Sequence, residues 1–461
     1  MAYRYGDRFQ TNLFPQSIEE YVAQDDPVRA YDAFVESLEL EGLGIVWDEY
    51  QVGNSEYDPK AMIKLLVYGY SYGIRSSRKL ERATYHNVSF IWLMGGLTPD
   101  HKTIANFRKN NKEALKNILK QCARLCIKLD LISGNTLFVD GSKIRANASI
   151  NSTWTQEKCE KYLKGIDEKE QSSESLVKIS DELKDKEALK FKIQNIMKEL
   201  QKEQVNSMNS TDKDCAKVKS RQGIHAGYNG QIVVDEKHGL IVNSDVTKES
   251  TDISQFAKQI EQANQVLGTK CKNACADAGY ANTDELKKID EQNINVIVPT
   301  QKQAHDTRPG PFDKEHFRYD SKNDCYYCPE GYRLRYSHFS VVKNHKLYRM
   351  ENKNQCLACK HYGICTNAER GRAIIRLLNE ETKQKLEKIY SSKQSKEIFK
   401  LRKQKVELPF GHIKRNLGVS AFLLKGLDGV KAEMSLFASC FNMSRMISII
   451  GVPTLVAKLM P

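Results

Sequence analysis

The segment Leu137-Phe-Val-Asp-Gly-Ser142 is a short apolar run that stops at an acidic residue, and it indicates a buried strand that ends at Asp140. Asp277 follows a second short apolar run, and Glu407 lies on an expected helix. Carboxylate oxygens are ligands that hard cations such as Mg²⁺ prefer. Two such ions about 3.5–4 Å apart promote an in-line phosphoryl displacement. We therefore predict that Asp140, Asp277 and Glu407 bind two divalent metal ions and are the catalytic residues.

Each of these carboxylates could instead have a purely structural role. An aspartate after a strand more often caps a turn. Glu407, four residues after Lys403, could be half of a surface ion pair worth about 0.3–0.5 kcal/mol. The neighbours favour a binding site, because the small residues around Gly141 allow close approach and Lys143 and Arg145 supply positive charge.

Length and charge limit the class of protein. A chain of 461 residues is too long for one compact core and predicts two or three domains. The net charge of +13 and the pI near 9.0 favour a polyanionic partner, although many solvated surfaces are also rich in lysine. No apolar run reaches about 18 residues and the start lacks a secretory signal, so we expect no membrane span and a cytoplasmic protein.

Residues 1–135 read as a helical domain. Asp58-Pro59 predicts a helix start, Ser76-Ser77 a second one, and Thr98-Pro-Asp100 a third helix that carries Arg108 and Lys109. This arrangement is typical of a DNA-binding helix-turn-helix motif, and equally of an ordinary helical bundle with a solvated basic face.

From residue 136 to 461 the pattern becomes mixed α/β. The strand before Asp140 is followed by a hairpin around Lys237-His-Gly239, a helix from Asp252, the strand before Asp277, another helix, and a strand at 294–298. This order matches a mixed sheet of the ribonuclease H type. We predict such a core, preceded by the all-helical N-terminal domain.

Two inserts interrupt the predicted core. Residues 155–220 are highly charged, with apolar positions three and four residues apart between Leu176 and Leu200, and predict a helical insert. It reads as a solvated arm with a packing stripe, or as a dimer or DNA contact. The second insert, residues 303–370, contains five of the 12 cysteines.

The cysteine spacing in the second insert indicates a metal site. Cys325 and Cys328 form one C-x₂-C pair, and Cys356 and Cys359 form another. Four thiolates at this spacing suit a structural Zn²⁺ ion in a zinc-ribbon-like insert, which the metal would help to fold. Cys365 is a further candidate ligand, and unrelated buried thiols are the alternative.

Several segments together carry a resemblance to a known family. They are Asp58–Met62, Tyr68–Glu81, Phe138–Asn147, His225–Asn229, Ala276–Tyr280 and Val406–Lys414. The chain resembles a bacterial insertion-sequence transposase of the IS4-like DDE class, and most closely the IS1182-type branch. The resemblance implies a helical DNA-binding domain, a ribonuclease H-like core, Mg²⁺ or Mn²⁺, DNA cleavage and strand transfer. It places the metal-binding roles on Asp140, Asp277 and Glu407.

The resemblance also implies double-stranded DNA as the partner, in the form of terminal inverted repeats and target DNA. It makes a homodimer the natural working state and implies association with the bacterial nucleoid. We expect the following basic residues to contact DNA: Lys143, Arg145, Lys403, Lys414, Arg415, Arg108 and Lys109. This chain departs from the family in one respect that affects this expectation. The family's signature around the catalytic glutamate has Tyr and Arg at the positions that Lys400 and Lys403 occupy here. Lysine cannot form the bidentate phosphate contact of arginine.

Two other classes remain compatible with the sequence. A transposase-derived protein that binds DNA without cutting it would use the same helices. A phosphatase of another fold could use the strand before Asp140, but Ser142 stands where its second aspartate is expected.

Overall fold

The computed structural model of the protein describes residues 17–45, 56–172, 180–220, 223–305, 310–341 and 344–460. The chain divides into two compact units. The first unit comprises residues 1–252, 258–272 and 401–461, and the second comprises residues 253–257 and 273–400. Leu176, at the start of the expected apolar stripe, lies outside the described residues.

The N-terminal part of the first unit is helical, and side-chain caps fix where its main helices begin. Asp58 and Asp100 accept hydrogen bonds from backbone N–H groups of the first helical turn, at 2.9 and 2.7 Å. The starts of α3 and α6 therefore lie where the caps predicted them. The helices are η1 (Ile18–Tyr21), α1 (Pro27–Glu36), α2 (Leu40–Leu43), α3 (Pro59–Ser71), α4 (Ser77–His86), α5 (Val88–Leu93), α6 (His101–Asn110) and α7 (Lys112–Lys128).

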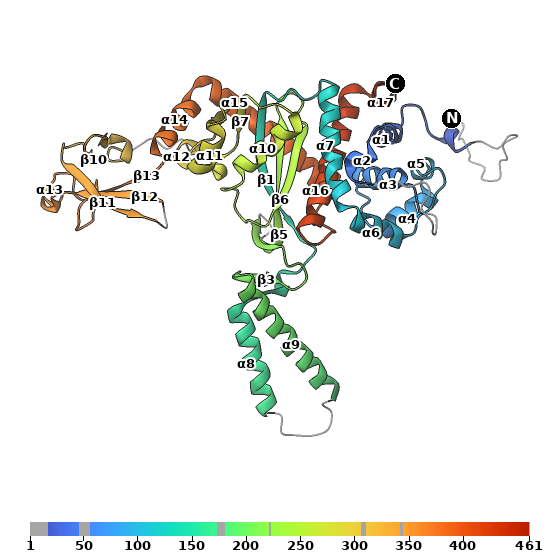
Figure 1. The fold of residues 1–461 in the computed structure, drawn as a ribbon, viewed down its shortest axis with the longest axis horizontal. Coiled ribbons are helices and arrows are strands. Elements are labelled where there is room, and N and C mark those ends of the chain that lie inside the picture. Colours follow the sequence, from blue (N-terminus) through green and yellow to red (C-terminus); the bar gives the residue numbers. More distant parts are fainter. Residues whose placement is uncertain are drawn as a thin grey trace, which may run out of the picture. The chain divides into compact units, whose positions relative to one another are not determined.

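Four antiparallel strands pair in the first unit (Figure 1). The long strand β5 (Gly223–Asp235) pairs with β1 (Thr136–Arg145) on one side. On its other side it pairs with β4 (Ala216–Ser220) and then with β6 (Ile241–Thr247). The prediction that the first strand ends at Asp140 is wrong, because β1 continues to Arg145. The apolar run does stop at Asp140, but pairing with β5 keeps the polar residues beyond it in the strand.

A buried helix, α16 (Leu427–Ile450), fills the core of the first unit beside α3, α7 and β6. Most of its apolar residues, including Phe437 and Phe441, are buried. Asn442 joins the helix to β6, because its side chain accepts from the N–H of Ile241 and donates to the carbonyl of Ile241, both at 2.8 Å. The C-terminal α17 (Val452–Leu459) packs against α1 and α16.

In the part of the chain that the structure describes, no single helix has the length and hydropathy to cross a membrane. The pair α16 and α17 meets that test together, with a bend of 111° between the two helices. Since α16 is buried in the first unit over most of its length, core packing accounts for its hydropathy.

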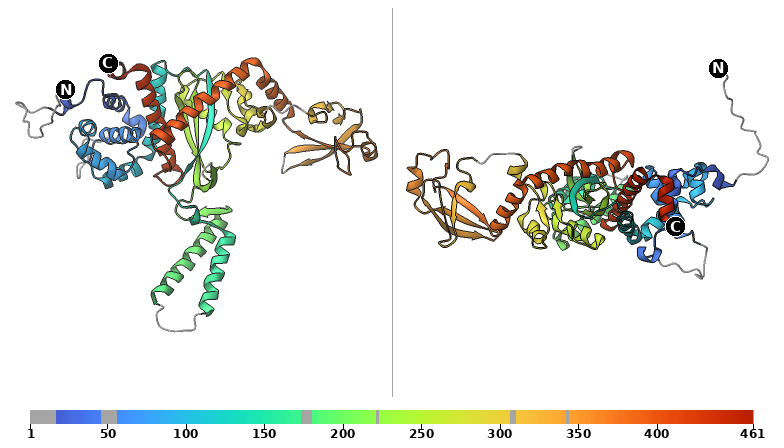
Figure 2. Two further views of the ribbon diagram at one scale, coloured as in Figure 1. Left: turned by 180° about the vertical axis from the view of Figure 1, so that it is seen from behind. Right: turned by 90° about the horizontal axis from the view of Figure 1, so that it is seen from above.

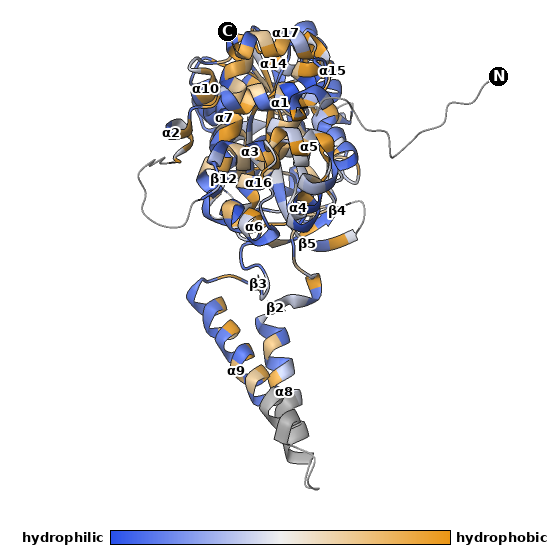
Figure 3. Cartoon of the chain, turned by 90° about the vertical axis from the view of Figure 1, so that its right-hand side faces the viewer, coloured by the Kyte–Doolittle hydropathy of each residue, from blue (hydrophilic) through white to orange (hydrophobic). Residues whose placement is uncertain are grey.

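The charged segment of the first unit forms a helical hairpin, in which α8 (Gln156–Ser172) and α9 (Ser180–Lys202) lie side by side (Figure 2). At its base β2 (Thr153–Thr155) pairs with β3 (Ser207–Asn209). Trp154, Cys159, Ile193 and Leu200 belong to one buried cluster there. Most of the surface of α9 is hydrophilic (Figure 3). The hairpin thus has its own small core, as the apolar spacing predicted.

The second unit contains two sheets. β7 (Asn273–Cys275) is parallel to β8 (Asn295–Ile297), and α11 (Thr283–Asp290) connects them. The other sheet is antiparallel, in the order β13-β12-β11-β10-β9. Its strands are β9 (Arg318–Asp320), β10 (Cys325–Tyr327), β11 (Arg333–Ser340), β12 (His345–Met350) and β13 (Ala373–Leu377). The cysteine-rich part therefore contains a five-stranded sheet, and the zinc-ribbon-like character of this insert stays a prediction.

Short helices complete the second unit. Lys385 of α14 bonds both carboxylate oxygens of Asp290 at 2.7 Å, which ties that helix to α11. These helices are α12 (Gln301–Ala304), α13 (Lys353–Leu357) and α14 (Glu380–Ser391), while α10 (Phe256–Leu267) and α15 (Lys393–Gly411) each span parts of both units.

Asp245 gives the first unit a pH dependence. Its buried carboxylate lies 2.6 Å from Lys258 Nζ and 3.0 Å from Lys431 Nζ. Burial acts to raise the pKa of Asp245, but the two lysines outweigh it and hold that pKa below its ordinary value. A lowered folded pKa contributes stability above the unfolded pKa, near 3.9, and that contribution is lost as the pH falls through the folded pKa.

We therefore expect Asp245→Asn to destabilise the protein at pH 7 by about 1–3 kcal/mol, with the deficit shrinking below about pH 4. Denaturant unfolding of both proteins between pH 7 and pH 3 measures this. A deficit that is constant with pH would show that the charge of Asp245 is not the cause.

Candidate active site

Asp140 lies in the middle of β1, opposite Ile232 of β5. It is partly buried, and its Oδ1 accepts a hydrogen bond from Arg402 Nη2 at 2.8 Å. Arg402 belongs to α15, far along the chain. Sequence analysis named Lys403, the neighbouring residue, as a DNA contact and assigned no role to Arg402. The sequence shows a run of basic residues before Glu407, but it does not show which of them contacts Asp140. Only the folded structure, in which distant segments meet, distinguishes Arg402 from Lys403.

A second contact connects the same strand and the segment after Glu407. Ser142 follows Asp140 by two residues, so both side chains leave the same face of β1. Lys414 Nζ donates a hydrogen bond to Ser142 Oγ. Glu407 lies between Arg402 and Lys414 in the chain, and its side chain is exposed. The two cations thus hold the segment that carries Glu407 against β1, close to Asp140.

The backbone around Glu407 is irregular. Pro409 lies inside α15, and the helix continues as a single π-helical stretch, His412–Asn416. Such π-helical turns are uncommon and occur often at functional sites. Burial lowers the pKa of His412, which leaves its imidazole neutral near pH 7.

A polar network lies on the face of the sheet opposite the Asp140 side chain. Lys143 Nζ is 3.2 Å from Asp252 Oδ1, and the side-chain amides of Asn229 and Gln231 both donate to the same oxygen at 2.7 Å. Sequence reasoning used Asp252 only as a helix start and did not predict this cluster. The ammonium of Lys143 is therefore held in place by the network, and it is partly buried.

Asp277 belongs to the second unit and lies two residues after β7, as the apolar run predicted. It caps the short helix η3 (Ala278–Tyr280), because its Oδ1 accepts from the N–H of Gly279 at 2.8 Å. A Cβ at position 279 would lie 2.9 Å from this oxygen, so a larger residue there would force the Asp277 carboxylate to shift. The structure thus shows a turn cap at Asp277, with its carboxylate partly exposed.

The other expected DNA contacts differ in accessibility. Arg145, Lys403, Arg415 and Lys109 are exposed. Arg108 is buried, and its guanidinium donates to Tyr70, to the carbonyl of Arg75 and to Ser77. These donors hold α3, α4 and α6 together. The placement of Arg108 therefore disagrees with the expectation of a solvent-facing contact.

The candidate helix-turn-helix consists of packed helices with a polar pocket. α4 and α6 contact each other, and the short α5 lies between them in the chain. Ser76, Arg78, His101, Lys102 and Asn106 are among the residues that line the pocket between these helices. Its groups suit a polar or anionic partner, and the DNA-binding role of these helices stays a prediction.

The donor chemistry of the three carboxylates suits a hard divalent cation. Within the described ranges, however, no three or more His, Cys, Asp or Glu side chains are grouped so as to hold a metal ion. Asp140 and Glu407 belong to the first unit and Asp277 to the second. The residues therefore fit the chemistry of such an ion, whereas the structure does not show them as an assembled group.

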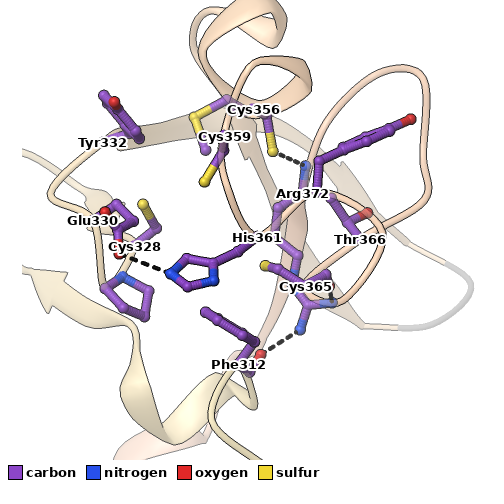
Figure 4. A pocket seen from close by; sticks show the side chains of 13 residues that line it. Phe312, Cys328, Glu330, Tyr332, Cys356, Cys359, His361, Cys365, Thr366 and Arg372 are labelled. Carbon is purple, nitrogen blue, oxygen red and sulfur yellow. Dashed lines mark hydrogen bonds and ion pairs between the residues drawn. The ribbon is translucent and has the colours of Figure 1, made fainter.

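The cysteines of the second unit are placed differently from the prediction. Cys328, Cys356, Cys359 and Cys365 line one pocket (Figure 4), while Cys325 is fully buried in β10 and is not among the lining residues. The pKa of the Cys365 thiol is raised chiefly by burial; Arg372 opposes this, and the three other pocket thiols raise it further.

Comparison with known proteins identifies the chain. The family described as "Transposase domain (DUF772)" matches residues 16–110, and the family described as "Transposase DDE domain" matches residues 327–447. The chain is a DDE transposase. Glu407 lies inside the second matched range, and α3, α4 and α6 lie inside the first.

The chain was also compared with curated proteins and with solved structures. No curated protein shows significant similarity to the transposase. Among solved structures, it is similar to the piggyBac transposase synaptic complex with hairpin DNA, with a TM-score of 0.35 and 10% sequence identity. The similarity covers 94% of this chain and 79% of the other.

Proposed function

We propose that the transposase cuts DNA at the ends of an insertion sequence and joins those ends to target DNA by phosphoryl transfer. Asp140, Asp277 and Glu407 are the proposed catalytic carboxylates. The observation that carries the proposal is the pair of contacts from Arg402 to Asp140 and from Lys414 to Ser142. They hold the segment around Glu407 beside Asp140, although more than 250 residues separate the two.

The three carboxylates would hold two Mg²⁺ or Mn²⁺ ions, which activate the attacking oxygen and stabilise the leaving oxygen when bound. The chain itself positions the substrate. Lys414, held by Ser142, presents an ammonium group on the face of β1 that carries Asp140, whereas Lys143, paired with Asp252, leaves the opposite face. A fixed cation such as Lys414 stabilises charge that develops on a phosphate.

The wider proposal follows the resemblance and the family matches. In this proposal, the elements β1, β5, β6, α10 and β7 form part of a ribonuclease H-like catalytic core. Residues 1–135 form a helical DNA-binding domain. Double-stranded DNA would contact the exposed residues Arg145, Lys403, Arg415 and Lys109. Holding two ends together favours a homodimer. Such DNA lies in the bacterial cytoplasm, where the protein would act with the nucleoid.

A structural zinc ion in the second unit also belongs to the proposal. Four thiols around one pocket provide the donors for it.

A DNA-binding protein without catalytic activity is the second candidate. One observation favours it: Arg402 forms an ion pair with Asp140, and a carboxylate engaged in this way is less available to a metal ion. In the catalytic proposal, Arg402 must release Asp140 when the metal ions bind.

Cleavage of a labelled duplex decides between the two candidates. The duplex carries the terminal sequences of the element that encodes the chain, and it is incubated with Mg²⁺, with Mn²⁺ or with a chelator. We expect strand cleavage with either metal, loss of cleavage with the chelator, and recovery when metal is added back. Binding of the duplex without cleavage in either metal would overturn the catalytic proposal in favour of the binding protein.

A further inference from the structure

We propose that the second unit binds one structural zinc ion through Cys328, Cys356, Cys359 and Cys365, and that Cys325 is not a ligand. This inference rests on the zinc part of the proposed function and names its ligands. It changes one member of the set expected from the two C-x₂-C pairs, and it does not depend on DNA cleavage.

Local turns bring the four thiols to one pocket. Cys328 begins a tight turn, in which the N–H of Gly331 donates to the carbonyl of Cys328 at 2.8 Å. Gly331 has a φ of 82°, which glycine adopts without strain. Cys356 and Cys359 lie at the end of α13, where the N–H of Cys359 donates to the carbonyl of Cys356 at 3.2 Å.

The fourth thiol reaches the pocket from the loop after α13. The N–H of Cys365 donates to the carbonyl of His361 at 2.8 Å, which folds the loop back towards Cys359. Cys328 and Cys365 both pack against the buried cluster that contains Cys356. The four thiols are thus contributed by two separate segments, the turn after β10 and the end of α13 with the loop that follows it. Two such segments are a common arrangement for a tetrahedral zinc site.

The surroundings favour negative charge in this pocket. The backbone N–H of Arg372 donates to Cys356 Sγ at 3.4 Å (Figure 4). The guanidinium of the same residue donates to the carbonyls of Cys365 and Phe312, at 3.0 and 2.9 Å. Four thiolates around Zn²⁺ carry a net charge of −2, which a fixed guanidinium and an N–H donor stabilise.

The strand geometry excludes Cys325. Cys325 and Tyr326 are adjacent in β10, so their side chains leave opposite faces of the sheet. Tyr326 belongs to the buried cluster with Cys356, which Cys328 and Cys365 contact. Cys325 therefore points away from the face on which the other thiols gather.

His361 also faces the pocket, but other groups hold its ring. Its Nε2 lies 3.1 Å from Glu330 Oε1, and its ring lies 4.6 Å from that of Phe312. An imidazole held by a carboxylate and a phenyl ring supports the wall of the pocket, so we do not include it among the ligands.

In the described residues, the thiols are not yet grouped as a coordination set. The backbone places them around the pocket, and rotation about their Cα–Cβ bonds is the change that binding requires. Binding would join the loop after α13 to the turn after β10, and so add to the stability of a sheet with a small buried cluster.

Zinc content of the full-length protein, purified under reducing conditions, tests the ligand set. We expect one zinc ion per chain in the wild type and in Cys325→Ser, the matched control. We expect a loss of at least about tenfold in zinc affinity in Cys365→Ser and in Cys359→Ser. Zinc bound in Cys365→Ser but lost in Cys325→Ser would overturn the proposal, as would a wild type that binds no zinc.

Two further measurements separate ligand loss from misfolding. Cys365→His replaces one zinc ligand with another and should retain the metal. With Co²⁺ in place of zinc, its thiolate-to-metal absorption should be weaker than that of the wild type, whereas Cys325→Ser should keep the wild-type spectrum. An unchanged Cys365→His spectrum would overturn the role of Cys365. Zinc binding without DNA cleavage would leave this inference intact and contradict only the catalytic proposal.

Discussion

Asp140→Asn is expected to lower the rate of DNA cleavage by roughly 10³-fold or more while leaving DNA affinity within about threefold of the wild type. The substitution keeps the size of the side chain and removes its charge. Asparagine is a much poorer ligand for a divalent cation, so the proposed activation of the attacking oxygen is lost. The basic residues that we propose to bind DNA remain, and binding should therefore be retained.

Single-turnover cleavage of the labelled duplex with Mg²⁺, together with a binding assay in the same buffer, measures this effect. Asp277→Asn and Glu407→Gln should lose cleavage to a similar extent. Asp428→Asn is the matched control, because Asp428 is an exposed carboxylate of α16 and its loss should leave the rate unchanged. A variant of the three that still cuts at the wild-type rate would remove its residue from the catalytic assignment.

The sequence predicts the position of Asp140 better than the extent of its strand. Leu137, Phe138 and Val139 are apolar and buried, and an apolar run is a local signal. Gly141 and Ser142 carry no such signal and read as a loop. They belong to β1 because β5 supplies partners for their backbone groups, and this partner comes from more than 80 residues later in the chain.

A similar reason limits what the sequence predicts about the second unit. The C-x₂-C spacing predicts cysteines that gather in space, but it cannot show which face of β10 each residue occupies. Cys325 and Cys328 are three residues apart, and only the packing of Tyr326 places them on different sides. The strands of this sheet contain many polar residues, so the apolar periodicity of the sequence does not predict a five-stranded sheet.

Glu433→Ala is expected to lower the free energy of unfolding by about 3–5 kcal/mol. Glu433 is fully buried in α16, and its Oε2 accepts from the N–H groups of Leu423 and Leu424 at 2.8 and 3.1 Å. Its Oε1 lies 3.4 Å from Arg75 Nη1. Alanine leaves these donors without their acceptor in the core, and it also leaves a cavity.

Denaturant unfolding at pH 7 measures this loss, with Asp428→Ala as an exposed control on the same helix that should change stability by at most about 0.5 kcal/mol. A loss below about 1 kcal/mol in Glu433→Ala would contradict the role of Glu433 as an acceptor in the core.

Glu433→Gln separates the acceptor from its charge. Burial raises the pKa of Glu433 above its ordinary value, although the two backbone N–H groups and Arg75 oppose the shift. A raised folded pKa contributes stability that is present below the unfolded pKa, near 4.3, and is lost as the pH rises through the folded pKa. Glutamine has no charge to desolvate, so its stability deficit at pH 7 should be smaller than that of alanine and should grow towards pH 4.

The core contacts of Glu433 also connect to the segment that carries the proposed catalytic residue Glu407. Leu423 and Leu424 belong to the loop that follows the π-helical stretch His412–Asn416, and Arg75 donates to the carbonyls of Gly418 and Ala421 in that loop. Lys414 and Glu407 precede the same loop. If Glu433 fixes the loop, Glu433→Ala should slow DNA cleavage even at temperatures where the variant is folded, while Glu433→Gln should not. Equal cleavage rates in the two folded variants would confine the role of Glu433 to stability.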